Sequence, residues 1–146
     1  MAGYSTTPLA KKLGIREGAL VVLVSPPPRF AELLEPLPND ARVLATLPKK
    51  EQLDVAIVFS SKKKDLEKGL KSALKSLSET GAIWIAWPKK SSGVVTEVDE
   101  FFVRRAGLAT GLVDNKVCAI DDTWSGLRFV VRVGDRTGYP KKRAAK

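Results

Sequence analysis

Residues 53–87 read LDVAIVFSSKKKDLEKGLKSALKSLSETGAIWIAW, and this stretch decides the fold class. An apolar run over 53–59 is typical of a buried strand, and a helix is expected over 62–78. Four leucines recur in that helix at spacings of four, four and three: Leu66, Leu70, Leu74 and Leu77. Gly81 is expected to end the helix before a second apolar strand over 82–87. A strand, a helix and a strand in succession predict neighbouring parallel strands.

The flanking sequence extends this pattern in both directions. We expect helices over 9–14, 30–34 and 96–106, and strands over 19–24, 42–47, 112–120 and 127–133. Thr96 and Asp99 resemble a capping box at the start of the third of these helices. The last two strands are close enough to form an antiparallel hairpin. The prediction is therefore an α/β, Rossmann-like fold with a mostly parallel sheet, helices on both faces and a C-terminal antiparallel hairpin.

The chain of 146 residues has the length of one domain, and no linker divides it. We expect a single α/β domain over 1–136 and a basic, disordered tail over 137–146. The tail holds four cations and no acid, which accounts for +4 of the formal net charge of +9: Lys141, Lys142, Arg143 and Lys146. Tails of this composition bind polyanions in a salt-sensitive way, so weak nonspecific nucleic-acid binding is one predicted property.

Composition excludes several classes of chemistry. The chain has no histidine and one cysteine, Cys118, so a Ser-His-Asp or Cys-His nucleophile and an ordinary zinc site are excluded. We assign no catalytic residue, no metal and no cofactor. No apolar run approaches the roughly 18 residues that cross a bilayer, and the N-terminus lacks the apolar segment of a secretory signal. A cytoplasmic protein without membrane association is expected.

The loop after the first predicted strand reads Ser25-Pro26-Pro27-Pro28-Arg29, where a nucleotide-binding fold places glycines. Three prolines remove three N–H donors and fix three φ angles. The architecture therefore suggests an enzyme, whereas the loop does not offer the backbone donors that a nucleotide cofactor needs.

Ligands of open α/β sheets bind beyond the carboxyl ends of the parallel strands. The loops expected there supply six candidate ligand-binding residues: Ser25, Ser60, Ser61, Trp87, Lys89 and Lys90. Ser60 and Ser61 lie at a predicted helix N-terminus, where hydroxyls and free amides attract an anion. Lys89 and Lys90 add positive charge. Alternatively, Ser61 is only a helix cap and the lysines belong to a solvated turn.

Asp114-Asn115-Lys116 interrupts an otherwise apolar predicted strand, which is costly unless these groups face water or a partner. We expect Asn115 and Lys116 to hydrogen-bond a ligand or a protein partner, with help from Trp124 in the hairpin turn. The alternative is that charge here protects a sheet edge from pairing with another chain.

The chain is similar over most of its length to a bacterial family catalogued only as a domain of unknown function. Four segments carry that resemblance: residues 4–15 (YSTTPLAKKLGI), 87–90 (WPKK), 111–120 (GLVDNKVCAI) and 124–127 (WSGL). The resemblance implies no activity.

The order of the elements resembles a shortened class I methyltransferase fold that lacks one strand and helix pair. In that family a glycine-rich loop follows the first strand and an acidic residue ends the second. Here these positions hold Ser25 to Pro28 and Thr46 to Lys49, so both parts of the S-adenosylmethionine site are missing.

The preferred hypothesis is a noncatalytic methyltransferase-like domain that binds an anionic small ligand or a protein partner. One alternative is an S-adenosylmethionine-dependent methyltransferase with an atypical cofactor loop. Another is nonspecific nucleic-acid binding through the basic tail.

Overall fold

The computed structural model describes residues 7–135, and the predicted alternation of strands and helices is confirmed there. The elements are α1 (Leu9–Lys12), β1 (Leu20–Val24), α2 (Phe30–Leu33), β2 (Arg42–Leu44), β3 (Leu53–Phe59), α3 (Lys63–Leu74), β4 (Leu77–Pro88), the 3-10 turn η1 (Lys90–Ser92), α4 (Glu100–Leu108), β5 (Val113–Ala119), β6 (Trp124–Val130) and the 3-10 turn η2 (Val133–Asp135). The predicted tail over 137–146 lies outside the described residues. Within 7–135, no helix has the length and apolar character needed to cross a membrane.

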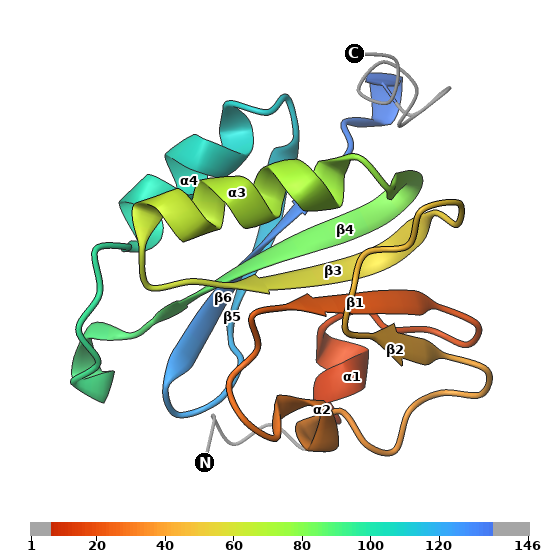
Figure 1. Ribbon diagram of the computed structural model, residues 1–146, viewed down its shortest axis with the longest axis horizontal. Coiled ribbons are helices and arrows are strands. Elements are labelled where there is room, and N and C mark those ends of the chain that lie inside the picture. Colours follow the sequence, from red (N-terminus) through yellow and green to blue (C-terminus); the bar gives the residue numbers. More distant parts are fainter. Residues whose placement is uncertain (1–6, 136–146) are drawn as a thin grey trace.

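The six strands form one sheet in the order β2-β1-β3-β4-β6-β5. The first four are parallel, whereas β6 runs antiparallel to β4 and β5 runs antiparallel to β6. Figure 1 shows α3 and α4 on one face of this sheet and the short helices α1 and α2 on the other. The predicted α/β fold, with helices on both faces and an antiparallel hairpin at its end, is confirmed.

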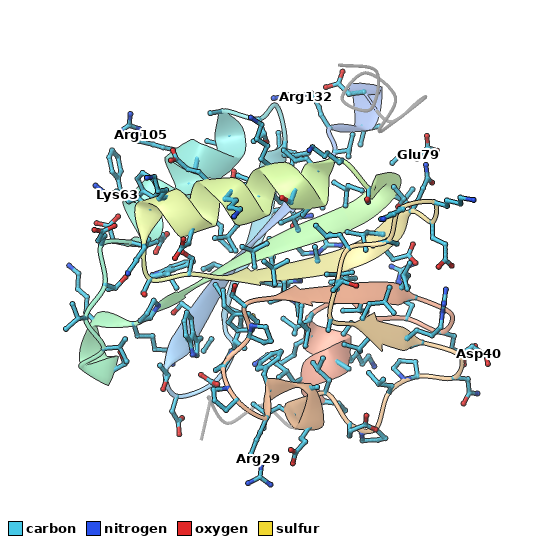
Figure 2. The ribbon with its side chains drawn as sticks, in the orientation of Figure 1. Arg29, Asp40, Lys63, Glu79, Arg105 and Arg132 are labelled. Carbon is cyan, nitrogen blue, oxygen red and sulfur yellow. The ribbon has the colours of Figure 1, made fainter. Side chains whose placement is uncertain are left out.

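Each face of the sheet carries its own apolar core. On the α3 and α4 face, Leu66 and Leu70 of α3 join side chains of the central strands. On the α1 and α2 face, Trp84 of β4 is fully buried, and its Nε1–H donates to the Leu13 carbonyl at 2.9 Å. This hydrogen bond ties the segment after α1 to the middle of the sheet. Charged side chains such as Arg29, Lys63 and Arg105 project outward from both layers (Figure 2).

The predicted end of the long helix was wrong. Helix α3 stops at Leu74, and Leu77 already belongs to β4, where it pairs with Leu53. The Leu53 amide donates to the Ser76 carbonyl at 2.7 Å, so the backbone after Lys75 bonds to β3 instead of continuing the helix. Gly81 lies inside β4, where a Cβ would come within 2.8 Å of the Leu53 carbonyl oxygen.

Other predicted boundaries also moved, among them the starts of the fourth helix and of the last strand. Helix α4 begins at Glu100 with Asp99 as its N-cap, whose Oδ1 accepts the Phe102 amide at 2.9 Å. Thr96 lies in the loop before it, where its hydroxyl donates to the Ser61 carbonyl at 3.2 Å, so the predicted capping box does not form. Strand β6 begins at Trp124 because that residue pairs with Pro88 of β4.

Candidate functional site

Three aromatic rings pack together across the carboxyl ends of the parallel strands. Phe30 follows β1, Phe59 ends β3, and Trp124 begins β6 beside the end of β4. The Phe59 ring meets Phe30 edge-on at 4.7 Å between centroids and Trp124 at 5.2 Å. Phe30 and Phe59 are only 2% and 3% exposed. The crevice in which this class of fold binds ligands is thus filled on this face by the chain's own side chains.

The proline loop offers little to a cofactor at the same edge. Ser25 is exposed with φ 54°, and Arg29 has φ 65° at the N-cap of the four-residue helix α2. Arg29 pairs with Glu32 at 3.1 Å on the surface. Between them the three prolines present rings where a nucleotide needs N–H donors. These residues therefore lack the backbone N–H donors with which a glycine-rich loop would bind S-adenosylmethionine.

The N-terminus of α3 already has an anion from this chain. Glu97 Oε1 accepts the Lys63 amide at 3.0 Å, and the Glu97 amide donates to the Ser61 carbonyl at 2.8 Å. Ser60 is buried, and its hydroxyl donates to the Lys62 carbonyl at 2.6 Å. The helix N-cap is Lys62, so the alternative in which Ser61 caps the helix was wrong. An external anion at Ser60 and Ser61 would have to displace the Glu97 carboxylate.

Trp87, Lys89 and Lys90 do line a common cavity of about 620 Å³ beyond the end of β4. The same cavity is lined by three carboxylate residues: Glu97, Asp99 and Glu100. Because the acids outnumber the lysines, an anion gains little here from the charge of the walls. Trp87 itself is 6% exposed and packs in the core beneath α3 and α4.

Asn115 and Lys116 lie elsewhere, on the edge strand β5. A bulge between Asp114 and Lys116 shifts the register with β6 and leaves Asn115 exposed. Asn115 Oδ1 accepts a hydrogen bond from Arg128 Nη1 at 3.2 Å. Lys116 Nζ donates to the Lys12 carbonyl at 3.4 Å, and Lys12 Nζ donates to the Ala119 carbonyl at 3.4 Å. Cations from α1, β5 and β6 therefore gather on one side of the sheet, on the face that carries α1.

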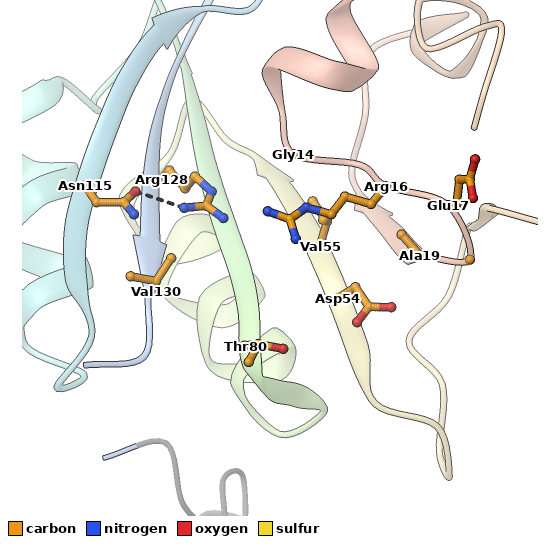
Figure 3. Close-up of a pocket in the computed structure, with 11 residues that line it drawn as sticks. Gly14, Arg16, Glu17, Ala19, Asp54, Val55, Thr80, Asn115, Arg128 and Val130 are labelled. Atoms are coloured by element: carbon orange, nitrogen blue, oxygen red, sulfur yellow. Dashed lines mark hydrogen bonds between the residues drawn. The ribbon is translucent and has the colours of Figure 1, made fainter. Parts of the chain in front are cut away.

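These cations surround two adjoining cavities of about 580 and 200 Å³, which share Gly14, Asn115 and Arg128 in their linings. We call the combined feature the basic groove, defined by six residues: Lys11, Lys12, Arg16, Asn115, Lys116 and Arg128. Figure 3 shows the side chains of Arg16 and Arg128 pointing toward one another across the larger cavity, whereas Glu17 points away from both. Gly14 adopts φ +80°, which only glycine takes readily, and this turn brings the chain alongside Arg128.

Four cations of the basic groove lie apart from the described carboxylates. Within residues 7–135, no carboxylate lies within 4.0 Å of the charged nitrogens of Lys11, Lys12, Arg16 or Lys116. Burial raises the pKa of the neighbouring Cys118 thiol, and the charges of Lys12 and Lys116 act in the opposite direction. No group of three or more potential metal ligands occurs in the described part of the chain.

Arg16 and Arg128 were not among the predicted site residues. They lie far apart in the sequence, and only the sheet register and the turn at Gly14 bring them together. The one available signal was Arg128 itself, a charge within the apolar run 127–131.

A family model described as "Protein of unknown function (DUF3052)" matches residues 40–133. The chain belongs to this family. The matched part contains the motifs at 87–90 and 111–127, whereas the motif at 4–15 precedes it. The predicted resemblance to a domain of unknown function is confirmed, and the DUF3052 description assigns no activity.

Several solved methyltransferases share the fold of this DUF3052 chain. A SAM-dependent methyltransferase from Aquifex aeolicus is 12% identical with a TM-score of 0.57, over 85% of this chain and 88% of that one. Magnesium protoporphyrin IX methyltransferase from Synechocystis PCC 6803 with bound SAM is 7% identical with a TM-score of 0.58, over 85% and 74%. N-methyltransferase NodS from Bradyrhizobium japonicum WM9 is 13% identical with a TM-score of 0.52, over 82% and 88%.

These likenesses confirm the predicted methyltransferase-like fold. At such identities they establish the fold and not the activity. None of the curated proteins compared with the chain matches it.

Proposed function

We propose that this DUF3052 chain is a noncatalytic methyltransferase-like domain that binds an anionic small molecule in the basic groove. The observation that carries the proposal is the convergence of Arg16 and Arg128 over one cavity (Figure 3). Two guanidinium groups that face each other repel. An anion between them would be attracted to both, and this attraction would offset the repulsion. Lys12 and Lys116 extend the positive charge into the adjoining cavity.

The electrostatics favour the basic groove over the carboxyl end of the sheet. At the carboxyl end, Glu97 already holds an amide of α3, and the cavity beside Trp87 has more acids than lysines. In the basic groove the balance is reversed, because among the described lining residues four lysines and arginines besides Arg128 outnumber two acids, Glu17 and Asp54. Of the predicted residues, Asn115 and Lys116 are therefore the ones we assign to the ligand.

The noncatalytic part of the proposal rests on what the residues offer. The chain has no histidine, and the Asp54 carboxylate already accepts the Leu20 amide at 2.8 Å through Oδ2. The groove is thus equipped to hold an anion and not to transform it.

The alternative function is an S-adenosylmethionine-dependent methyltransferase with an atypical cofactor loop, and the fold of the three solved methyltransferases favours it. It requires a source of backbone donors other than the proline loop. The positive charge of the chain would also attract other polyanions, such as a nucleic acid or an acidic segment of a protein partner. Binding that disappears when residues after Gly138 are removed would assign the attraction to the tail.

Thermal unfolding in the presence of inorganic phosphate and of S-adenosylmethionine tests the proposal. Phosphate at about one hundred times its Kd is expected to stabilise the chain by about 2.7 kcal/mol, which is several degrees in Tm. The double variant Lys12→Ala/Lys116→Ala should lose most of that shift. Lys68→Ala, which removes an exposed lysine from α3, is the matched control and should keep it.

Equal phosphate shifts in the wild type and the double variant would contradict the proposal, because phosphate would then act through bulk solvent or another surface. A shift with S-adenosylmethionine alone would favour the methyltransferase.

A further inference from the structure

The two cavities of the basic groove differ in the charge of their lining residues, and this difference indicates which kind of anion the groove binds. Its smaller cavity, about 200 Å³, is lined by Lys11, Lys12 and Lys116, together with the shared residues Gly14, Asn115 and Arg128. No carboxylate residue of the described chain is part of that lining. An anionic group is therefore favoured at this end and at its junction with the larger cavity.

The junction is built around Arg128. Its guanidinium is oriented by Asn115 Oδ1 at 3.2 Å, and Arg16 faces it from the loop before β1 (Figure 3). Planar guanidinium groups bind two oxygens of one phosphate at once, which a lysine does not do. Two arginines and two flanking lysines match the doubly charged head of a phosphate monoester better than a single carboxylate.

Away from the arginines, the larger cavity is lined by hydrogen-bond acceptors. Asp54 of β3 lies there with Thr80, which belongs to the irregular part of β4 opposite Asp54, since Leu53 pairs with Leu77 and Val55 pairs with Ala82. Asp54 accepts the Leu20 amide through Oδ2, and its carboxylate retains further acceptor capacity on Oδ1. A carboxylate repels a phosphate but accepts hydrogen bonds from hydroxyl groups.

The side chains that line the larger cavity also indicate the chemistry of the rest of the ligand, beyond its anionic group. No aromatic side chain occurs among the described residues that line the larger cavity, and its apolar floor comes from Ala19, Val55 and Val130. A nucleobase would find no ring on which to stack. The volume of about 580 Å³ lies within the range of small-molecule sites, so a compact polyhydroxyl body fits without one.

We propose that the basic groove binds a phosphorylated sugar, with the phosphate between Arg16, Arg128 and Lys116 and the hydroxyl groups against Asp54 and Thr80. This inference rests on the proposed function, since it names the class of anion that the same groove takes. It separates the roles of the two ends: the cations hold the phosphate, and Asp54 with Thr80 selects a hydroxyl-bearing body.

The experiment is isothermal titration calorimetry with four probes: inorganic phosphate, ribose, ribose 5-phosphate and adenosine 5′-monophosphate. For the wild type we expect ribose 5-phosphate to bind about tenfold more tightly than inorganic phosphate, which is the effect of one added hydrogen bond to a charged group. Ribose alone should not bind measurably, and the adenosine nucleotide should gain nothing over ribose 5-phosphate.

The variants distinguish the two ends of the groove. Asp54→Asn keeps an acceptor for the Leu20 amide, and Thr80→Val removes only an exposed hydroxyl, so both should fold. Each should reduce the preference for ribose 5-phosphate while leaving the affinity for inorganic phosphate equal or higher. Lys12→Ala/Lys116→Ala should weaken both phosphate probes, and Lys68→Ala should weaken neither.

Equal affinities for inorganic phosphate and ribose 5-phosphate, unchanged in their ratio by Asp54→Asn and Thr80→Val, would overturn the sugar-phosphate inference and leave the anion site intact. An adenosine nucleotide bound more than tenfold more tightly than ribose 5-phosphate would overturn it in favour of a nucleotide. Absence of binding by all four probes would overturn the proposed function itself.

Discussion

Replacing Phe59 by alanine tests whether the carboxyl end of the sheet is packed core or a site that opens. Phe59 is 3% exposed and meets two rings edge-on, Phe30 at 4.7 Å and Trp124 at 5.2 Å. Loss of a buried phenylalanine side chain costs about 3–5 kcal/mol, of which each edge-to-face pair supplies about 0.5–1.5 kcal/mol. We therefore expect Phe59→Ala to lower the free energy of unfolding by about 3–5 kcal/mol. Urea denaturation at 25 °C measures this change, with the m-value unchanged.

The control is Phe101→Ala, because the Phe101 side chain is 68% exposed and the Arg105 guanidinium lies 5.5 Å from its ring centroid. A cation–π contact at an exposed site contributes about 0.5–1 kcal/mol, so this variant should lose no more than that. A loss below about 1 kcal/mol for Phe59→Ala would refute the reasoning. The three rings would then not be packed against one another, and the carboxyl end would have room for a ligand.

Two further predictions concern packing and pH. Gly107→Ala would place a Cβ 2.1 Å from Phe129 Cε2, so α4 must move off β6. The overpacking cost of about 1–3 kcal/mol should exceed the gain of about 1 kcal/mol in helix propensity, and a thermal melt with an unchanged or raised Tm would contradict this. Burial raises the pKa of the Cys118 thiol, so the folded chain holds this proton more tightly than the unfolded chain does. The resulting contribution to the free energy of unfolding is complete below the unfolded pKa of about 8.5, and it is lost as the pH rises through the pKa of the folded chain. Urea melts between pH 7.5 and 10 should show the wild type losing stability relative to Cys118→Ala, and parallel pH profiles for the two proteins would disprove the assignment.

The central part of the fold was predictable because its signals are local. Strand β1 and the segments 55–59 of β3 and 82–87 of β4 are continuous apolar runs, and the leucine spacing of α3 is helical. The end of α3 was mispredicted because Leu77 continues the leucine spacing, whereas its backbone pairs with Leu53 of β3. Whether such a residue continues the helix or pairs with a strand depends on tertiary contacts, which the local sequence pattern does not indicate.

The candidate site was predictable only in part. Asn115 and Lys116 were identified because polar residues in an apolar strand are costly unless they have a use. Arg16 was missed because nothing near it in sequence marks a ligand, and its role depends on the position of Arg128 across the groove (Figure 3). Conversely, the anion site expected at Ser60 ignored Glu97, which reaches the same helix end from a loop more than thirty positions away.

The most direct test of the central claim is a nuclear magnetic resonance titration of the 15N-labelled chain with inorganic phosphate. The account predicts that the largest amide shifts fall at residues 11, 12, 14, 16, 115, 116 and 128, which line the basic groove. Amide shifts concentrated at Ser25, Arg29 and residues 59–63 would contradict it, because they would place the anion at the carboxyl end of the sheet.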